Sequence, residues 1–254
     1  MKALPEIIVA DAQALRACCD DIASHPHVAF DTEFVGEDSY IPHLCLVQVA
    51  TPKALYIIDP FECGSLESFW LLLLDPARLS IVHAGREELR ICTHAVGKPP
   101  SQLFDVQLAA GLLGLGYPLG YAPLIQTTLR KTINKGQTLT DWRKRPLSDE
   151  QLRYAFDDVR YLLAVWKKLD TKLTALQRQE WASEEFAAFT GQALQNSCAV
   201  ERWRKLKGTS SLDSRRLAIV RALYEWRETV AAKRNRPVRT VLRDDLLVEL
   251  AKRE

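Results

Sequence analysis

The chain has 254 residues with 47% hydrophobic and 26% charged side chains, which excludes collagen-like, low-complexity and disordered chains. Its length allows one large domain with a substantial core. The apolar run from Phe69 to Leu74 is too short to cross a bilayer, and residues 1–13 lack the segments of a signal peptide. The sequence therefore predicts a cytoplasmic protein without a membrane partner, and it indicates no protein partner.

Charge is distributed unevenly along the chain. Residues 199–254 contain 15 Lys and Arg against 8 Asp and Glu, whereas the rest of the chain contains 19 against 24. A second basic cluster, between Arg130 and Arg145, interrupts the acidic part. Such segments are often only solvated, but they are also typical of contact with a polyanion, so nucleic acid is one candidate partner.

The first half of the chain alternates between two kinds of apolar pattern. A helix is expected over residues 10–23. Short apolar runs then predict strands over residues 28–34, 44–51 and 54–59. Further along, the pattern predicts helix 65–74, strand 79–83, helix 86–96, a short strand at 103–104 and a helix from 105. Together these elements indicate an α/β fold with a mixed five-stranded sheet flanked by helices.

The second half is predominantly helical. A polar loop without periodicity covers residues 131–146, and a capping box formed by Ser148 and Gln151 then predicts a long helix to about Leu173. After a linker near residues 191–198, apolar residues at helical spacing predict a small all-helical unit.

Two acids lie close together in the first predicted strand. Asp31 and Glu33 are two residues apart, so both side chains leave the same face of the sheet. Paired carboxylates repel each other unless a cation holds them, and Mg²⁺ takes oxygen ligands of this kind. The alternative is a strand edge with two solvated acids.

The helix after Gly85 contains two adjacent acids, of which only one can face inward. At about 100° per residue, Glu88 falls in the middle of the arc that contains Ile91 and Cys92, whereas Glu87 falls outside it. An ionised carboxylate on an apolar face is costly without a partner. The partner of Glu88 is therefore either a metal ion or a buried arginine.

The long helix repeats this arrangement with Asp157 and Asp158. Asp157 has cationic neighbours three and four residues away and is expected to be a surface ion-pair residue. Asp158 lies at the margin of the buried stripe, with Tyr154 one turn earlier. This pair is either a structural Tyr–Asp contact or a metal ligand beside a hydroxyl that orients water.

Three motifs in this order resemble those of the RNase D group of DEDDy-type 3′-to-5′ exonucleases: D-T-E-F at Asp31, H-A-G-R-E-E-L at His83 and Y-A-F-D-D-V at Tyr154. The strings I-P-H-L-C-L-V-Q-V-A, F-D-V-Q and K-G-Q-T-L-T-D-W-R-K-R-P-L are similar to the same group. Further on, W-R-K-L-K-G through D-D-L-L-V-E-L resembles the opening of an HRDC nucleic-acid-binding domain. The resemblance implies an RNase H-like exonuclease domain over residues 1–197 and a partial HRDC-like region over residues 198–254.

The resemblance also implies a mechanism with two Mg²⁺ or Mn²⁺ ions. Asp31 would bridge both ions, Glu33 and Asp158 would complete the first, and Glu88 would serve the second, where the group has an aspartate. Two such ions clamp the attacking and leaving oxygens of a phosphoryl displacement. Tyr154 would orient the attacking water, and 5′-monophosphates would leave from RNA 3′ ends, such as those of tRNA precursors, in preference to DNA.

Substrate contacts are implied by the same resemblance. Phe34 would stack on the terminal base, although its alternation with Phe30 equally favours core packing. In the polar loop, Lys135, Gln137, Arg143 and Arg145 would contact the phosphates behind the scissile bond.

Other residues of these motifs are expected to have structural roles. Trp142 is expected to be a packing anchor, Asp105 a helix cap or a support for the acids, and His83 a core histidine. A rival hypothesis, based on Glu88 in place of the aspartate, is a catalytically impaired protein that binds RNA without cutting it.

Overall fold

The computed structural model describes residues 3–133, 141–197 and 202–253, without the side chains of residues 192–197. The chain forms two compact units. The first contains residues 1–34 and 44–194, and the second contains residues 35–43 and 195–254. None of the described helices has an apolar stretch long enough to cross a membrane.

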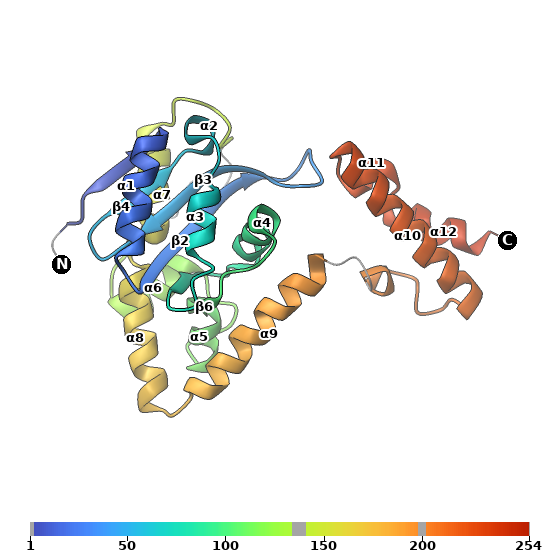
Figure 1. Ribbon diagram of the computed structural model, residues 1–254. Coiled ribbons are helices and arrows are strands. Elements are labelled where there is room, and N and C mark those ends of the chain that lie inside the picture. The colour runs from blue at the N-terminus through green and yellow to red at the C-terminus, as the bar shows by residue number, and fades with distance from the viewer. Residues whose placement is uncertain (1–2, 134–140, 198–201, 254) are drawn as a thin grey trace. The chain divides into compact units, whose positions relative to one another are not determined.

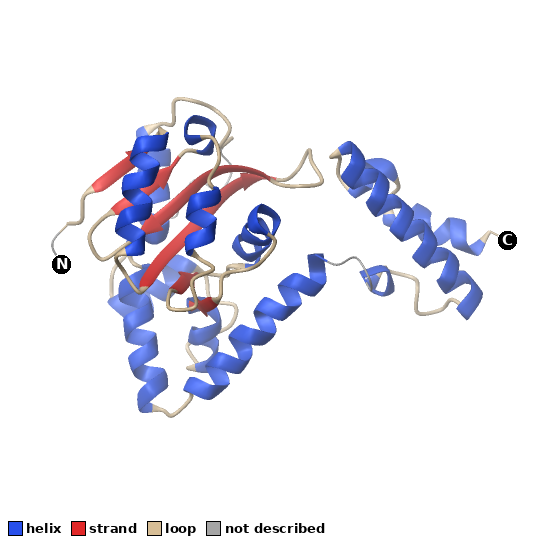
Figure 2. Ribbon diagram, viewed as in Figure 1, coloured by secondary structure: helices blue, strands red, loops and turns tan. Residues whose placement is uncertain are grey.

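The first unit is built on a mixed sheet with the strand order β1-β4-β3-β2-β5-β6 (Figure 2). Its strands are β1 (Glu6–Val9), β2 (His27–Val35), β3 (His43–Ala50), β4 (Leu55–Ile58), β5 (Leu79–Val82) and β6 (Gln102–Asp105). The pairs β1–β4, β2–β5 and β5–β6 are parallel, and β3–β4 is antiparallel.

The mixed sheet confirms the predicted fold class, but the expected number of five strands was one too low. The additional strand is β1, which pairs with β4 through Ile7↔Tyr56 and Ile8↔Ile57. β1 has only four residues and lies at the sheet edge, and the partner that makes it a strand is about fifty residues away. A local sequence pattern does not contain this information.

Helices cover both faces of the sheet (Figure 1). α1 and α3 pack together over one face, while α7 packs against β4 behind the other. The helices up to the linker are α1 (Ala12–Ala23), α2 (Pro60–Cys63), α3 (Glu67–Leu72), α4 (Arg86–Val96), α5 (Val106–Leu112), α6 (Tyr121–Leu129), α7 (Asp149–Arg160), α8 (Leu162–Ala175) and α9 (Gln179–Ser197).

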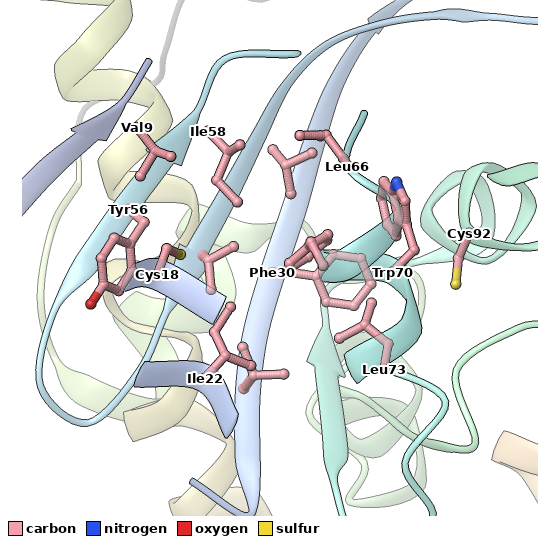
Figure 3. Close-up of a cluster of buried hydrophobic side chains, with 14 of the residues drawn as sticks. Val9, Cys18, Ile22, Phe30, Tyr56, Ile58, Leu66, Trp70, Leu73 and Cys92 are labelled. Carbon is pink, nitrogen blue, oxygen red and sulfur yellow. The ribbon is translucent and has the colours of Figure 1, made fainter. Parts of the chain in front are cut away.

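The apolar core on the α1 and α3 side fixes the orientation of β2 (Figure 3). Phe30 is fully buried there and meets Phe69 and Trp70 edge-on, with ring centroids 6.1 and 6.3 Å apart. Leu89 and Cys92 of α4 belong to the same cluster. Because side chains alternate along a strand, Phe30 and Thr32 share this face, and Asp31 and Glu33 point to the other.

The predicted long helix after Ser148 is two helices. α7 begins with the predicted capping box, since Ser148 accepts from the Gln151 amide and the Gln151 side chain accepts from the Ser148 amide. It ends at Arg160, and α8 begins at Leu162, so Tyr161 separates the two helices. No Pro or Gly marks the break, so the expectation of one helix to about Leu173 was wrong at this point.

The second unit is helical, as expected. It contains η1 (Arg202–Lys205), α10 (Ser214–Arg234), α11 (Val238–Val241) and α12 (Asp244–Lys252). Trp203, Val220, Tyr224, Leu247 and Ala251 form its core.

The second unit also includes the tip of the β2–β3 hairpin, which the prediction of a contiguous C-terminal region did not anticipate. The Tyr40 hydroxyl donates to Glu228 Oε2 at 2.9 Å, and the Ile41 amide donates to Asn235 Oδ1 at 3.1 Å. Arg239 donates to the Glu37 carbonyl at 3.1 Å.

Candidate active site

The end of β2 and the start of α4 bring the first three acids of the site together. The turn before α4 is held by Asp105, whose carboxylate accepts from the Ala84 and Gly85 amides at 3.2 and 2.9 Å. Gly85 packs directly on Val82, because a Cβ added at Gly85 would lie 2.3 Å from Val82 Cγ2. Asp105 also caps α5 through the Gln107 amide, which confirms its predicted capping role.

Glu88 is the inward acid of α4, as its helical phase predicts. Its side chain is only 6% exposed, whereas Glu87 forms a surface ion pair with Arg90 at 2.8 Å. Thr32 Oγ1 donates to Glu88 Oε1 at 2.8 Å in buried surroundings. Within the described residues no arginine pairs with Glu88, so the arginine alternative is not the arrangement found.

Asp158 joins the cluster from α7. Asp157 forms a 2.6 Å ion pair with Arg160, which confirms its predicted surface role. Asp158 instead accepts a hydrogen bond from the Tyr154 hydroxyl. Trp142 is 5% exposed and packs on the Tyr154 ring with centroids 5.8 Å apart, so it is the predicted packing anchor.

Charge repulsion places Asp31 and Glu33 close to the carboxylates of Glu88 and Asp158. Burial, followed by the charges of Glu88, Asp158 and Glu33, raises the pKa of Asp31 well above its usual value. Burial and the charges of Asp158 and Glu88 raise the pKa of Glu33 to about 8. Solvated acids on an exposed strand edge would not behave this way.

The other two acids respond in the same direction. Burial raises the pKa of Glu88 to about 7, although hydrogen bonds, first that of Thr32, partly oppose it. Burial and then the charge of Asp157 raise the pKa of Asp158 to about 7, against the hydrogen bond from Tyr154. The site is therefore a concentrated negative charge that favours protons or divalent cations.

The donor chemistry of the cluster fits a hard divalent cation. Among the described residues, no three or more His, Cys, Asp or Glu side chains are placed so that they could hold a metal ion by themselves. Mg²⁺ usually binds through only one or two carboxylates and keeps water or phosphate in its other positions. Closely apposed carboxylates suit such open coordination, and Asp31 and Glu88 are close enough to hydrogen-bond to each other.

The four loop residues that were expected to contact the substrate phosphates differ in how exposed and how tightly bound they are. Lys135 and Gln137 lie outside the described residues. Arg143 is nearly half exposed and pairs with Asp141 at 2.9 Å. The guanidinium of Arg145 is bound internally, since it pairs with Asp59 at 2.5 Å and donates to the carbonyls of Cys45 and Trp142. Arg145 could contact a phosphate only by giving up these partners.

Phe34 directly follows Glu33 in the chain, and His83 precedes the turn that leads into α4. Phe34 is half-buried at the end of β2. The His83 Nε2 atom lies 2.9 Å from the Leu119 carbonyl, as expected for a histidine with a structural hydrogen bond.

Two residues near the acids were not found from the sequence. Thr32 donates its backbone amide to Asp31 Oδ1 at 2.9 Å as well as its hydroxyl to Glu88. The helical phase of Glu88 indicated that its carboxylate is buried and needs a partner, and this was the only hint in the sequence of a donor such as Thr32. Tyr121 packs on His83, and burial followed by the charge of Asp158 raises the pKa of its phenol. No pattern in the sequence indicated Tyr121.

The fold and the acid cluster together define an exonuclease-type domain. The chain belongs to the 3′-5′ exonuclease family, whose sequence model matches residues 7–174. A match to the HRDC domain covers residues 216–254.

Curated relatives are similar over nearly the whole chain. Ribonuclease D of Shewanella sp. (strain ANA-3) is 36% identical over 246 residues, which cover 97% of this chain and 63% of the relative. Ribonuclease D of Pseudomonas paraeruginosa is 36% identical over 98% of this chain and 66% of its own length. The chain thus spans less than two thirds of these relatives.

Solved structures agree with the fold. Escherichia coli RNase D, described as an exoribonuclease involved in structured RNA processing, has a TM-score of 0.89 at 30% identity, over 96% of this chain and 65% of the other. Brucella melitensis NrnC with bound Mg²⁺ has a TM-score of 0.62 at 22% identity, over 84% and 98%. The second similarity concerns the fold alone.

Proposed function

We propose that the protein is a divalent-metal-dependent 3′-5′ exoribonuclease that releases nucleoside 5′-monophosphates. The observation that carries this proposal is the convergence of Asp31, Glu33, Glu88 and Asp158, from three separate segments, on one buried cluster with raised pKa values. Metal sites, proton relays and other functional sites concentrate such groups.

The four acids would hold two ions, Mg²⁺ or Mn²⁺. Asp31 would contact both ions, Glu33 and Asp158 the first, and Glu88 the second. When bound, the ions would neutralise charge on the phosphate oxygens and activate water. The chain's own residues would position the substrate against them.

Tyr154 would orient the attacking water. Burial and the charges of Asp158 and Glu33 raise the pKa of Tyr154, so its phenol keeps its proton at neutral pH and acts as a donor. Its hydrogen bond to Asp158 and its packing on Trp142 fix the direction of that donor. Tyr154 would therefore be a fixed hydroxyl rather than a base.

RNA 3′ ends, such as those of tRNA precursors, would be preferred over DNA. The names of the relatives support this preference, and the excess of Lys and Arg in residues 199–254 suits a phosphate backbone. Phe34, Lys135, Gln137 and Arg143 would contact the terminal nucleotides, with Arg145 anchoring their loop. The free thiols of the five described cysteines are typical of the cytoplasm, where we place this activity.

A nuclease assay tests the activity with matched pairs of adjacent acids. In Mn²⁺, the wild type should release monophosphates from a 3′-labelled RNA. Asp158→Asn and Glu88→Gln should lower the rate by at least about 100-fold, the scale of one lost metal-supporting contact. Asp157→Asn and Glu87→Gln change surface ion pairs and should leave the rate within about twofold. RNA binding without any product from the wild type would favour the impaired RNA-binding protein instead.

The role of the basic region is tested separately. Replacing Arg and Lys side chains within residues 199–254 by Gln should weaken RNA binding and lessen its dependence on salt. The reason is that binding releases about one counterion for each phosphate contact, so a variant with fewer contacts releases fewer counterions. Affinity measured at several salt concentrations gives this slope. Unchanged affinity and slope would contradict the role, and a DNA competitor as effective as RNA would contradict the preference for RNA.

A further inference from the structure

Thr32 donates hydrogen bonds to two of the four clustered acids. Its backbone amide binds Asp31 Oδ1 at 2.9 Å, and its hydroxyl binds Glu88 Oε1 at 2.8 Å. The Thr32 side chain is 6% exposed, as is that of Glu88, so water does not compete freely for this hydroxyl. A hydrogen bond to a charged group in such surroundings is worth more than one at the surface.

The geometry explains why Glu88 needs a donor of this kind. α4 packs on the same side of the sheet as Phe30 and Thr32, since Leu89 and Cys92 belong to the Phe30 cluster. Asp31 and Glu33 point to the other side. The Glu88 carboxylate lies within hydrogen-bond reach of both the Thr32 hydroxyl and Asp31, so Thr32 holds it on the α4 side while it contacts Asp31.

We infer that Thr32 is a positioning residue that holds the Glu88 carboxylate in place for the second divalent ion. A glutamate side chain has one more rotatable bond than an aspartate, and the hydrogen bond to Thr32 removes this freedom. The Thr32 amide fixes one oxygen of Asp31 at the same time. One residue thus sets the spacing of two acids that come from different elements. This inference rests on the proposed metal-dependent function.

Metal binding without RNA provides the test. Mn²⁺ titration of the full chain, followed by calorimetry and by the paramagnetic signal of free Mn²⁺, should show weaker binding in Thr32→Val by about 10- to 100-fold, the usual effect of losing a residue that orients a metal ligand. Thr32→Ser keeps the hydroxyl and should bind within about threefold of the wild type. Thr128→Val is the matched control, because Thr128 is buried and its hydroxyl donates to the Leu124 carbonyl of its own helix.

A second pair of variants tests whether Thr32 acts through Glu88. In a Glu88→Gln background, Thr32→Val should cause little further loss of Mn²⁺ affinity. The carboxylate that Thr32 positions has already been replaced by an amide in this background. If Thr32→Val does not fold, Thr32→Ala and Thr32→Ser form the same comparison with and without the hydroxyl.

The outcomes separate this inference from the proposed function. Wild-type Mn²⁺ affinity in Thr32→Val, or equal losses in Thr32→Ser and Thr32→Val, overturns the role of Thr32 while wild-type nuclease activity remains. Failure of the wild type to bind Mn²⁺ or to cut RNA overturns the proposed function itself, whatever Thr32 does. A lower melting temperature with unchanged Mn²⁺ affinity identifies Thr32 as a structural residue only and also overturns the inference.

Discussion

Individual carboxylates of the acid cluster lower the stability of the metal-free chain when they are ionised. Glu33 lies among acids that, after burial, raise its pKa to about 8, so its ionised form is less favourable in the folded chain than in the unfolded one. Because the folded pKa of Glu33 lies above its ordinary value of 4.5, this penalty begins above about pH 4.5, grows up to about pH 8 and is constant at higher pH. Removing the charge of Glu33 should therefore increase the stability of the metal-free protein.

Glu33→Gln should raise the unfolding temperature in EDTA by about 2–4 °C, the shift for 1 kcal/mol in a domain of this size. It should also remove most of the stabilisation that Mn²⁺ gives to the wild type. Differential scanning calorimetry with EDTA and with Mn²⁺ measures both effects. Glu62→Gln, at an exposed acid of α2, is the control and should change neither. A lower unfolding temperature of Glu33→Gln in EDTA would contradict the repulsion.

At this scale the sequence distinguished neighbours that differ by one position. Helical phase separated Glu88 from Glu87, and charge spacing separated Asp157 from Asp158, because both arguments depend only on local geometry. Local geometry could not predict that Arg145 pairs with Asp59. Asp59 lies 86 residues earlier, and only the folded sheet brings the two side chains together. The roles of the acids in metal binding remain predictions.

Among the elements, Arg145 attaches the described part of the loop before α7 to β3 and to Asp59. The Arg145 guanidinium pairs with Asp59 and donates hydrogen bonds to the Cys45 and Trp142 carbonyls. It also lies 4.6 Å from the centroid of the Phe61 ring. Arg143, two residues earlier, is nearly half exposed and pairs with Asp141. The two arginines therefore form a natural comparison.

Arg145→Gln should lower the free energy of unfolding by about 2–4 kcal/mol, because it leaves Asp59 without its partner and removes several charge-assisted hydrogen bonds. Arg143→Gln should cost less than about 1 kcal/mol. Urea unfolding measures both values. Equal costs for the two variants would show that Arg145 does not anchor the loop.

A second attachment between elements joins α1 to the β3–β4 turn. Burial alone would raise the pKa of Asp21, but hydrogen bonds from Thr51 and Tyr56 and the nearby Lys53 outweigh it and lower the pKa. Since the folded pKa lies below the unfolded one, ionised Asp21 stabilises the fold above about pH 4 and loses this effect as the pH falls through the folded value.

Asp21→Asn should therefore cost about 1–3 kcal/mol at pH 7. The difference from the wild type should shrink below about pH 4. Urea unfolding across this pH range tests the prediction, with the exposed neighbour variant Asp20→Asn as control. A difference that is the same at pH 7 and pH 3 would rule out the charge of Asp21 as the cause.

Elements with strong local signals were predictable, and those defined by distant partners were not. The helix from Arg86 to Val96 was expected at its observed bounds, because its apolar arc and its flanking glycines lie in the segment itself. β1 depends on its pairing with β4, and the break at Tyr161 depends on packing of α7 and α8 against different neighbours. Neither is encoded in a local pattern.

At the scale of the whole molecule, the second compact unit is discontinuous in the sequence. The hairpin tip of residues 35–43 belongs with residues 195–254, and the hydrogen bond from Tyr40 to Glu228 joins the two segments. Glu228 also lies 3.6 Å from the buried Arg227. The tip therefore contributes to the stability of the helical unit.

Tyr40→Phe should reduce the stability of the second unit by about 1 kcal/mol, the value of one hydrogen bond. Hydrogen exchange should report faster exchange of the α10 amides and unchanged exchange in β5. Tyr117→Phe, at a tyrosine that is 64% exposed, is the control. Unchanged exchange in α10 would show that the tip and the helices are independent.

This discontinuity has a consequence for anyone who builds chimaeras from these proteins. A cut near residue 195, which a reader of the linear sequence would choose, transfers the helices without the nine residues that belong with them. The recipient then keeps a hairpin end evolved for another set of helices. A graft that carries residues 35–43 together with the C-terminal segment would preserve the native partners on both sides.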